Sequence, residues 1–346
     1  MLQMVAAKAG LVPSVLEEYG AITRAAVREY LPAREPKIYL YDLLSDYPGR
    51  GGKMMRPSIC IAAARMFGGQ IEEVLLTAVA IELFHNALLI HDDIEDGSEQ
   101  RRSRPTLHLI HGMPLALNAG DALTLMALKP LLDNRYRIGE ALSLRVFDEL
   151  ERMARECAEG QSIDLGWRQH NALVIDDGQY LEMVLKKTCW LASIFPMRAG
   201  ALVGSRGAVD PDPFVRFGFF LGAAFQIQDD LLNLCGDHRY GKERDGDLWE
   251  GKRTLMLIQA LRESTGEERD RLCAILCRSR AERTAQEVAW MRYLIEKYDA
   301  VSYARQMANE LAGAALHEFA LLSGEIPDSR DKEFFQQMPA WVIERT

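Results

Sequence analysis

The stretch LLIHDDIEDGSEQRR, residues 88–102, decides the fold because it ends an apolar helical segment in four crowded acids. On a helix, Asp92 and Asp96 lie one turn apart and face the same way. Both would lie near a helix C-terminus, where the macrodipole already places partial negative charge, so a cation must compensate them. The segment QDDLLN at 228–233 repeats this arrangement, with Asp229 and Asp230 after a second apolar helix.

These two acidic segments predict a magnesium site. Carboxylate oxygens with no accompanying set of Cys or His ligands suit Mg²⁺, which binds one or two protein carboxylates together with substrate phosphates. A solvated helix end would explain either segment alone. Two such segments at the ends of apolar helices are better explained by a bundle that aims both at one cavity mouth.

Helical periodicity extends outward from this stretch in both directions. The segment IEEVLLTAVAIELFHNALLIHDD at 71–93 is apolar nearly all round in its second half, which is typical of a helix buried in a large bundle. No run of alternating apolar and polar residues indicates a strand. The loops at 47–52, 112–114, 210–213 and 236–247 are too short for domain linkers. We therefore expect a single all-α domain over residues 1–346.

The amino-acid composition indicates the expected cellular compartment and disfavours some classes of binding partner. Apolar residues make up 48% of the 346 residues, and the net charge of −9 argues against nucleic acid as a partner. The six cysteines lie in apolar or helical runs and are expected to be reduced thiols of a cytoplasmic protein. No stretch approaches about 20 uninterrupted apolar residues, so no transmembrane segment is expected. The N-terminus lacks the charge order of a signal peptide.

Basic residues bracket both acidic segments in the sequence, as expected if Mg²⁺ and a diphosphate share one site. Phosphate groups need cations from several directions because their charge is spread over several oxygens. A nucleotide site is not supported, because GxGxxG is absent and GGK lacks the spacing of a P-loop. The bracketing cations are Lys53, Arg56, Arg101, Arg102, Lys187, Lys242 and Lys252.

Six ordered segments across nearly the whole chain resemble the trans-isoprenyl diphosphate synthases, or polyprenyl synthetases. They are GGKMMRP, HDDIEDGSEQRRSRPTLH, GQSIDLGW, KKTCW, FQIQDDLLN and YGKERDGDLWEGKRTL. The resemblance implies an all-α bundle around a deep central cavity, the isoprenoid synthase fold, and a homodimer. It also implies Mg²⁺-dependent head-to-tail condensation of an allylic diphosphate with isopentenyl diphosphate.

The resemblance also implies a role for each matching residue. Metal ligands would be Asp92, Asp96 and Asp229, holding three Mg²⁺ ions. Arg101, Lys187 and Lys242 would bind the allylic diphosphate, and Lys53, Arg56, His85 and Arg102 isopentenyl diphosphate, with Lys252 as a further substrate cation. Thr188 and Gln226 would lie beside the reacting carbons, where neutral polar groups stabilise a cation without capturing it, and Phe225 could add a cation–π face.

Two positions depart from the family pattern. The second acidic motif of the family often ends in Asp, whereas this chain has Asn233, which offers a carbonyl oxygen without charge and is doubtful as a ligand. Met54 replaces a common Arg and leaves Lys53 and Arg56 to bind the substrate. Glu95 has no assigned role and is expected to face away from the metals.

The helix before the first acids is expected to set product length. In the resembling family, bulk on this helix forms the floor of the cavity in which the product grows. Ala87 and Leu88, five and four residues before Asp92, are not aromatic, which disfavours a fifteen-carbon product. Phe84 is the next large group on that face, which favours the twenty-carbon geranylgeranyl diphosphate.

Other functions stay open at this point. A class I terpene cyclase shares Mg²⁺ and an all-α cavity but has no use for the isopentenyl diphosphate cations. A weakly catalytic regulatory subunit would be expected to have eroded acidic motifs, and a structural helical protein would need neither acidic segment. Farnesyl or longer polyprenyl diphosphates are alternative products.

Overall fold

The computed structural model describes residues 10–236 and 245–345, so the predicted substrate cation Lys242 lies outside the described residues. The first half contains α2 (Leu11–Glu29), η2 (Lys37–Tyr41), α3 (Asp42–Gly49), α4 (Met55–Met66), α5 (Ile71–Glu95), β1 (Gln100–Arg101), β2 (Arg104–Pro105), α6 (Leu107–His111), α7 (Met113–Asp133), α8 (Arg135–Ile138) and α9 (Glu140–Gln169). The second half contains α10 (Asp177–Val184), the π-helix η3 (Leu185–Ile194), α11 (Phe195–Gly204), α12 (Phe214–Cys235), α13 (Gly246–Glu250), α14 (Leu255–Glu263), α15 (Gly266–Leu276), η5 (Arg280–Glu282), α16 (Ala285–Lys297), α17 (Ala300–Leu322) and α18 (Arg330–Glu344).

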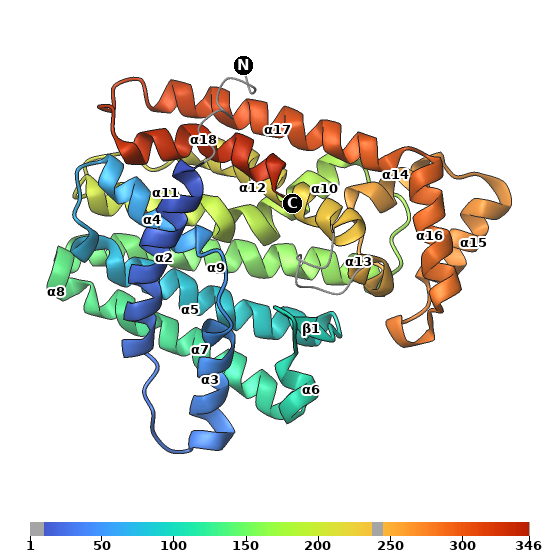
Figure 1. Cartoon of the computed structure of the whole chain (residues 1–346), viewed down its shortest axis with the longest axis horizontal. Coiled ribbons are helices and arrows are strands. Elements are labelled where there is room, and N and C mark those ends of the chain that lie inside the picture. Colours follow the sequence, from blue (N-terminus) through green and yellow to red (C-terminus); the bar gives the residue numbers. More distant parts are fainter. Residues whose placement is uncertain (1–9, 237–244, 346) are drawn as a thin grey trace.

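Helix α5 runs through the bundle between α4 and α7 (Figure 1). Its first turn is capped where the backbone N–H of Gln70 donates to the Glu73 carboxylate at 2.9 Å. The helix stops after Glu95, where Gly97 adopts a φ of 61° that favours glycine. Because the middle of α5 is mostly apolar, and its polar Glu82 and Asn86 are also buried, it packs against several neighbouring helices, and its terminal acids lie at one end of the bundle.

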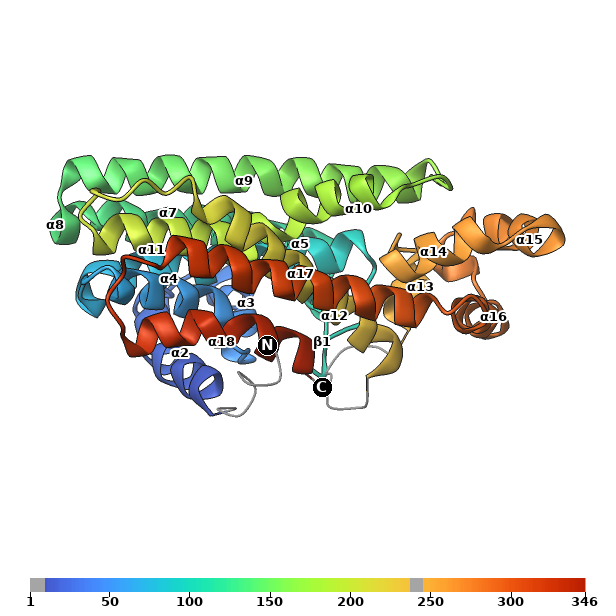
Figure 2. The same ribbon diagram turned by 90° about the horizontal axis from the view of Figure 1, so that it is seen from above.

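The other long helices converge on the same end. Helix α12 packs against η3 and α17, and α9 packs against η3 (Figure 2). The contact between α9 and η3 requires Gly160, because a Cβ at this position would overlap the backbone of Lys187. This close approach places Lys187 against the acids of α9 and α5. In Figure 1 the ends of α5 and α12 lie near β1 and α13.

The all-α prediction is confirmed, with one small addition that the sequence did not indicate. Residues Gln100–Arg101 and Arg104–Pro105 form a two-residue antiparallel pair. Arg102 and Ser103 have φ of 54° and 60° at its turn, as expected for a tight hairpin. The buried Arg50 guanidinium donates to the carbonyl oxygens of Arg101, at 3.0 Å, and Pro105, at 2.9 Å. The hairpin is therefore held by a residue about 50 positions earlier in the chain, and its two-residue strands are too short to show an alternating apolar pattern.

Within residues 10–236 and 245–345, two helical stretches, Ile71–Glu95 and Met113–Ile138, are long and apolar enough to cross a membrane by length and composition alone. A core helix of a soluble protein passes the same test. In the first stretch, 67% of the apolar window is buried inside the bundle, and in the second 39% is buried. The first stretch is α5, whose apolar surface is covered by neighbouring helices of this chain.

Candidate active site

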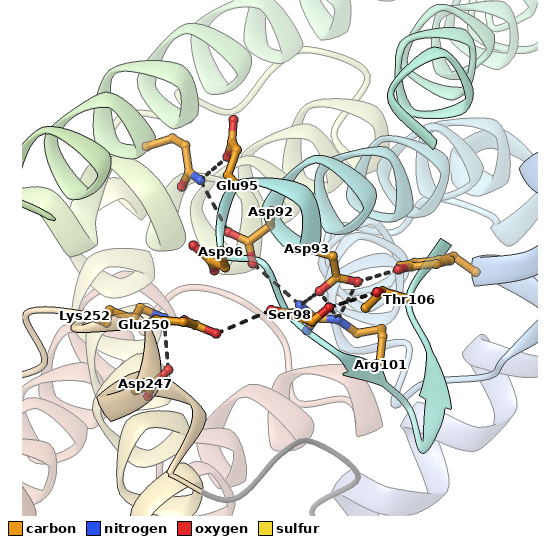
Figure 3. Close-up of polar contacts among 12 residues, drawn as sticks. Asp92, Asp93, Glu95, Asp96, Ser98, Arg101, Thr106, Asp247, Glu250 and Lys252 are labelled. Atoms are coloured by element: carbon orange, nitrogen blue, oxygen red, sulfur yellow. Dashed lines mark hydrogen bonds and ion pairs between the residues drawn. The ribbon is translucent and has the colours of Figure 1, made fainter. Parts of the chain in front are cut away.

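The middle acid of the first segment, Asp93, binds a cation of the chain. Its fully buried carboxylate accepts hydrogen bonds from Nε of Arg101 at 3.0 Å, from Arg101 Nη2, and from the Tyr47 hydroxyl (Figure 3). Arg101 Nη2 also lies 3.7 Å from Oδ2 of Asp92. Asp93 therefore positions Arg101 beside Asp92, one of the predicted metal ligands, a role that the sequence did not assign to Asp93.

Asp92 and Asp96 lie on the same face of α5, as predicted, and each lies near cations from other helices. Lys187 Nζ lies 3.7 Å from Asp92 Oδ1, and Arg168 Nη2 lies 2.7 Å from Asp96 Oδ1. Burial, followed by the charge of Asp92, raises the pKa of Asp96 to about 6, although Lys187 and Arg168 act in the opposite direction. Glu95 is exposed, and its carboxylate accepts a hydrogen bond from Gln161.

Helix α9 contributes Asp164 and Arg168, neither of which was assigned a role from the sequence. Asp164 is fully buried and accepts a hydrogen bond from the Lys187 ammonium. Burial would raise the pKa of Asp164, but the charges of Lys187, Arg168 and Lys252 outweigh it and hold the pKa below its usual range. Arg168 lies four residues after Asp164, and this one-turn spacing next to the GQSID segment could have revealed it.

Helix α13 brings two further acids to the site that sequence reasoning missed. A small pocket is lined by two acids from the end of α5, Asp92 and Asp96, and by two acids from α13, Asp247 and Glu250. The other residues that line it are Ser98, Gln100, Arg101, Asn233, Gly246 and Lys252. Lys252 Nζ lies 3.7 Å from Asp247 Oδ1. Burial, then the nearby charges of Asp96 and Asp247, raises the pKa of Glu250. Both acids occur in GDLWEGK, a segment in which only Lys252 was predicted to bind substrate.

In the second acidic segment, the hydrogen bonds to Asp230 come from neutral side chains. The buried Asp230 carboxylate accepts hydrogen bonds from the Tyr180 hydroxyl at 3.2 Å and from Gln226 Nε2 at 2.7 Å. Thr188 in turn donates to Gln226 Oε1 at 2.9 Å. Burial raises the pKa of Asp230 to about 7, against the opposing charge of Lys252. The structure thus joins Thr188 and Gln226, two predicted neighbours of the reacting carbons, in one hydrogen-bonded chain.

Phe225 lies in the same turn of α12 as Gln226, and one face of its ring is covered. The Arg345 guanidinium lies 4.0 Å from the ring centroid, and its Nη2 donates to the Phe225 carbonyl oxygen at 3.2 Å. This face of the ring therefore makes its cation–π contact with Arg345, and a contact with a reacting carbon must use the other face.

A second group of cations lies around the loop before α4. Arg102 donates to the Tyr47 carbonyl oxygen at 2.9 Å and passes close over Gly52, where a Cβ would lie 2.9 Å from Arg102 Nη2. Burial lowers the pKa of Lys53, the charge of Arg345 adds to this, and Asp229 opposes it. Asp229 therefore lies within electrostatic range of this group, which we call the loop cations: Lys53, Arg56 and Arg102.

Arg56 and Arg102 both lie near a buried carboxylate, Glu82, on α5. Burial raises the pKa of Glu82, while Asn86, Arg102 and Arg56 act to lower it. Glu82 accepts from Asn86 Nδ2 at 2.8 Å. His85, one turn after Glu82, is half-buried on the same helix. Glu82 was not identified from the sequence and compensates the two arginines.

The donor chemistry of the first acids fits a divalent cation. Asp96 Oδ1 and Asp164 Oδ1 are buried, and neither has a hydrogen-bond partner among the residues that the structure describes. Within those residues no three acids, histidines or cysteines already surround one ion-sized space. Oxygen-only ligands with unused acceptor capacity suit Mg²⁺, which completes its shell with water and substrate phosphate.

The remaining predicted positions have simple environments. Phe84 and Ala87 are buried on α5, and Leu88 is half-buried. Asn233 accepts the backbone N–H of Asp247 at 3.1 Å through Oδ1. Asn233 therefore ties the end of α12 to α13, which is consistent with its doubtful role as a metal ligand.

Known proteins match the chain along nearly its whole length. A short chain isoprenyl diphosphate synthase from Methanothermobacter thermautotrophicus is 31% identical over 96% of this chain and 98% of its own. A geranylgeranyl pyrophosphate synthase from Geoglobus acetivorans is 30% identical over 97% and 99%. The crystal structure of a polyprenyl synthase from Caulobacter crescentus, complexed with calcium and isoprenyl diphosphate, superposes with a TM-score of 0.84 at 27% identity over 97% of both chains. The polyprenyl synthetase family profile matches residues 37–293, and the chain belongs to this family of prenyltransferases.

Proposed function

We propose that the protein condenses an allylic diphosphate with isopentenyl diphosphate head to tail and releases geranylgeranyl diphosphate. The observation that carries the proposal is the arrangement of two separate groups of cations around the acids. Lys187 and Lys252 lie among Asp92, Asp96 and Asp247, while the loop cations lie on the side of Asp229. Two groups of cations suit two diphosphates.

Asp92, Asp96 and Asp229 would hold Mg²⁺, and we propose three ions. Bound Mg²⁺ would supply electrostatic stabilisation of the negative charge on the leaving diphosphate. Lys187, already held by Asp164, would add its charge to the same diphosphate, as would Arg101 from its place on Asp93. The chain thus keeps these cations in position before the substrate arrives.

The proposed reaction breaks the allylic C–O bond, forms a C–C bond to the alkene of isopentenyl diphosphate and loses one proton. Thr188 and Gln226 present neutral oxygens near the developing allylic cation, and the apolar surface of α5 keeps water from capturing it. No general base is assigned to a side chain. The leaving diphosphate, held by the cations, would accept the proton.

A single assay tests this function. The full chain is incubated with isopentenyl diphosphate, Mg²⁺ and each allylic diphosphate in turn, and products are separated by chain length. We expect elongation that depends on both substrates and on the metal. A hydrocarbon or alcohol formed without isopentenyl diphosphate would identify a class I cyclase instead.

Product length is proposed to be set by Phe84. This buried ring lies eight residues before Asp92 on α5, and the smaller Ala87 lies between them. Phe84→Ala should lengthen the main product beyond twenty carbons, as measured by chromatography of the hydrolysed prenyl alcohols. A farnesyl main product in the wild type, or an unchanged distribution in the variant, would contradict this role.

We propose that two copies of the chain form a dimer through α7. Apolar side chains recur along one exposed stripe of this helix, and Leu125 is 68% exposed; the stripe is Met113, Leu117, Leu125 and Leu132. An exposed apolar patch of this kind marks an interface. Leu125→Glu should convert the dimer to a monomer in light scattering, and a monomeric wild type would contradict the assignment.

We also propose that the enzyme is located in the cytoplasm. The six cysteines are unpaired in the structure, which supports a reducing cytoplasm, and 67% of the apolar window of α5 is buried by neighbouring helices. We propose a single catalytic domain with two small diphosphate substrates and no nucleic-acid partner.

A further inference from the structure

Arg168, one residue before the end of α9, reaches the predicted metal ligand Asp96 from across the site. Its Nη2 lies 2.7 Å from Asp96 Oδ1 and 3.6 Å from Asp164 Oδ2. The side chain is only 13% exposed. Arg168 is therefore a mostly buried cation in contact with an oxygen that the metal would use.

The contact between Arg168 and Asp96 is a close charge pair without hydrogen-bond alignment. Arg168 Nε, Arg168 Nη2 and Asp96 Oδ1 are all buried, and none has a hydrogen-bond partner among the described residues. Arg101 differs, because it donates through both Nε and Nη2 to Asp93. Nε and Nη2 of Arg168 can therefore turn to another acceptor, such as a phosphate oxygen, without breaking an aligned hydrogen bond to the described residues.

We propose that Arg168 is a movable counter-ion that exchanges Asp96 for the allylic diphosphate when Mg²⁺ binds. With no ligand present, its charge neutralises the buried Asp96 carboxylate. Once metal and diphosphate enter, Arg168 leaves Oδ1 and donates to diphosphate oxygens. This inference rests on the proposed function, because it takes the diphosphate and the metal from that reaction.

The exchange follows from competition for one oxygen. Mg²⁺ binds its oxygen ligands at about 2.0–2.1 Å, and a guanidinium on the same oxygen would repel it. A diphosphate supplies acceptors that match the planar fork of arginine. Asp164 is a weaker alternative, because its Oδ2, which lies 3.6 Å from Arg168 Nη2, already accepts a hydrogen bond from Lys187. Arg168 should therefore oppose metal binding alone and favour metal binding together with diphosphate.

Two calorimetric titrations of the full chain test the proposal with R168Q. One adds Mg²⁺ alone, and the other adds inorganic diphosphate at saturating Mg²⁺. Without the competing charge, Mg²⁺ alone should bind about 3- to 10-fold more tightly. Diphosphate should bind about 10- to 100-fold more weakly, since charge-assisted hydrogen bonds are lost. A merely structural role would not move the two affinities in opposite directions.

R155Q is the matched control, because Arg155 lies on the same helix in exposed ion pairs with Glu151 and Glu159. Its two affinities should equal those of the wild type. Parallel weakening or no change in R168Q overturns the counter-ion proposal. A wild type that binds no diphosphate with Mg²⁺ overturns the proposed function instead. If R168Q does not fold, R168K keeps the charge but loses the fork, so diphosphate must still bind about 3- to 10-fold more weakly.

Discussion

The two acidic segments share a sequence pattern but compensate their charge differently. At the end of α5, cations face the acids: Arg101 donates to Asp93, and Arg168 lies 2.7 Å from Asp96. At the end of α12, Asp230 accepts hydrogen bonds from the neutral Tyr180 and Gln226. A pair of aspartates after an apolar helix therefore does not determine how its charge is balanced.

The difference suits the division of work that we propose. Cations around the first segment can bind a diphosphate when metal arrives, because they already lie in the site. Neutral donors around the second segment can face a carbocation without repelling it, and Thr188 extends this neutral chain through Gln226. Substituting matched positions in the two segments tests whether this contrast is real.

Asp92→Asn should have the largest effect. Removing a charged metal ligand is expected to lower kcat by about 10³-fold, because the charge of the leaving diphosphate loses its preorganised stabilisation. Product formation and Mg²⁺-dependent diphosphate binding should both fall. Glu72→Gln makes the same change of charge in the exposed first turn of α5 and should leave both unchanged. Less than a tenfold loss for Asp92→Asn would refute its role as a ligand.

Asp93→Asn should act on stability instead. The substitution leaves Arg101 buried without its negative partner, and breaking such a pair costs about 3–5 kcal/mol. Urea denaturation should show this loss in the free energy of unfolding. Glu95→Gln, on the exposed side of the same turn, should change it by less than about 0.5 kcal/mol. Equal stability of the two variants would show that Asp93 does not hold Arg101.

Tyr180→Phe examines the neutral compensation of the second segment. It removes one hydrogen bond to the buried Asp230, which should lower the free energy of unfolding by about 1–2 kcal/mol. Tyr293→Phe is the control, because Tyr293 is 53% exposed. A loss as large as that of Asp93→Asn would mean that Asp230 depends on Tyr180 as strongly as Asp93 depends on a cation.

The sequence was sufficient to predict the all-α fold and the relative placement of several residues in the ordered motifs. The apolar, all-round periodicity of 71–93 predicted a buried helix, and the structure places Asp92 and Asp96 on one face of α5 as expected. Thr188 and Gln226, predicted separately to lie near the reacting carbons, form a hydrogen bond across two helices. These positions were predictable because each segment resembles a family motif.

Residues that join the site only because folding brings distant parts of the chain together were not predictable in the same way. Asp247 and Glu250 become part of the acidic pocket only because α13 folds back beside α5. Tyr47 lies in α3 and Arg50 directly follows this helix, and nothing in their local pattern points to Asp93 or to the hairpin at 100–105. A sequence indicates which side chains can carry charge, but the balance among them depends on how the helices pack.

Asn233→Asp should have the smallest effect and bears directly on the asymmetry of the two segments. A carboxylate can still accept the Asp247 N–H that Asn233 binds at 3.1 Å. Because Asn233 is buried, the added negative charge near Asp247 should cost about 1 kcal/mol of stability, and kcat should stay within about threefold. Asn309→Asp, on the exposed face of α17, controls for the change itself. A tenfold rise in kcat would mean that the charge restores a metal ligand, and the second segment would then have to be counted as a metal site as complete as the first.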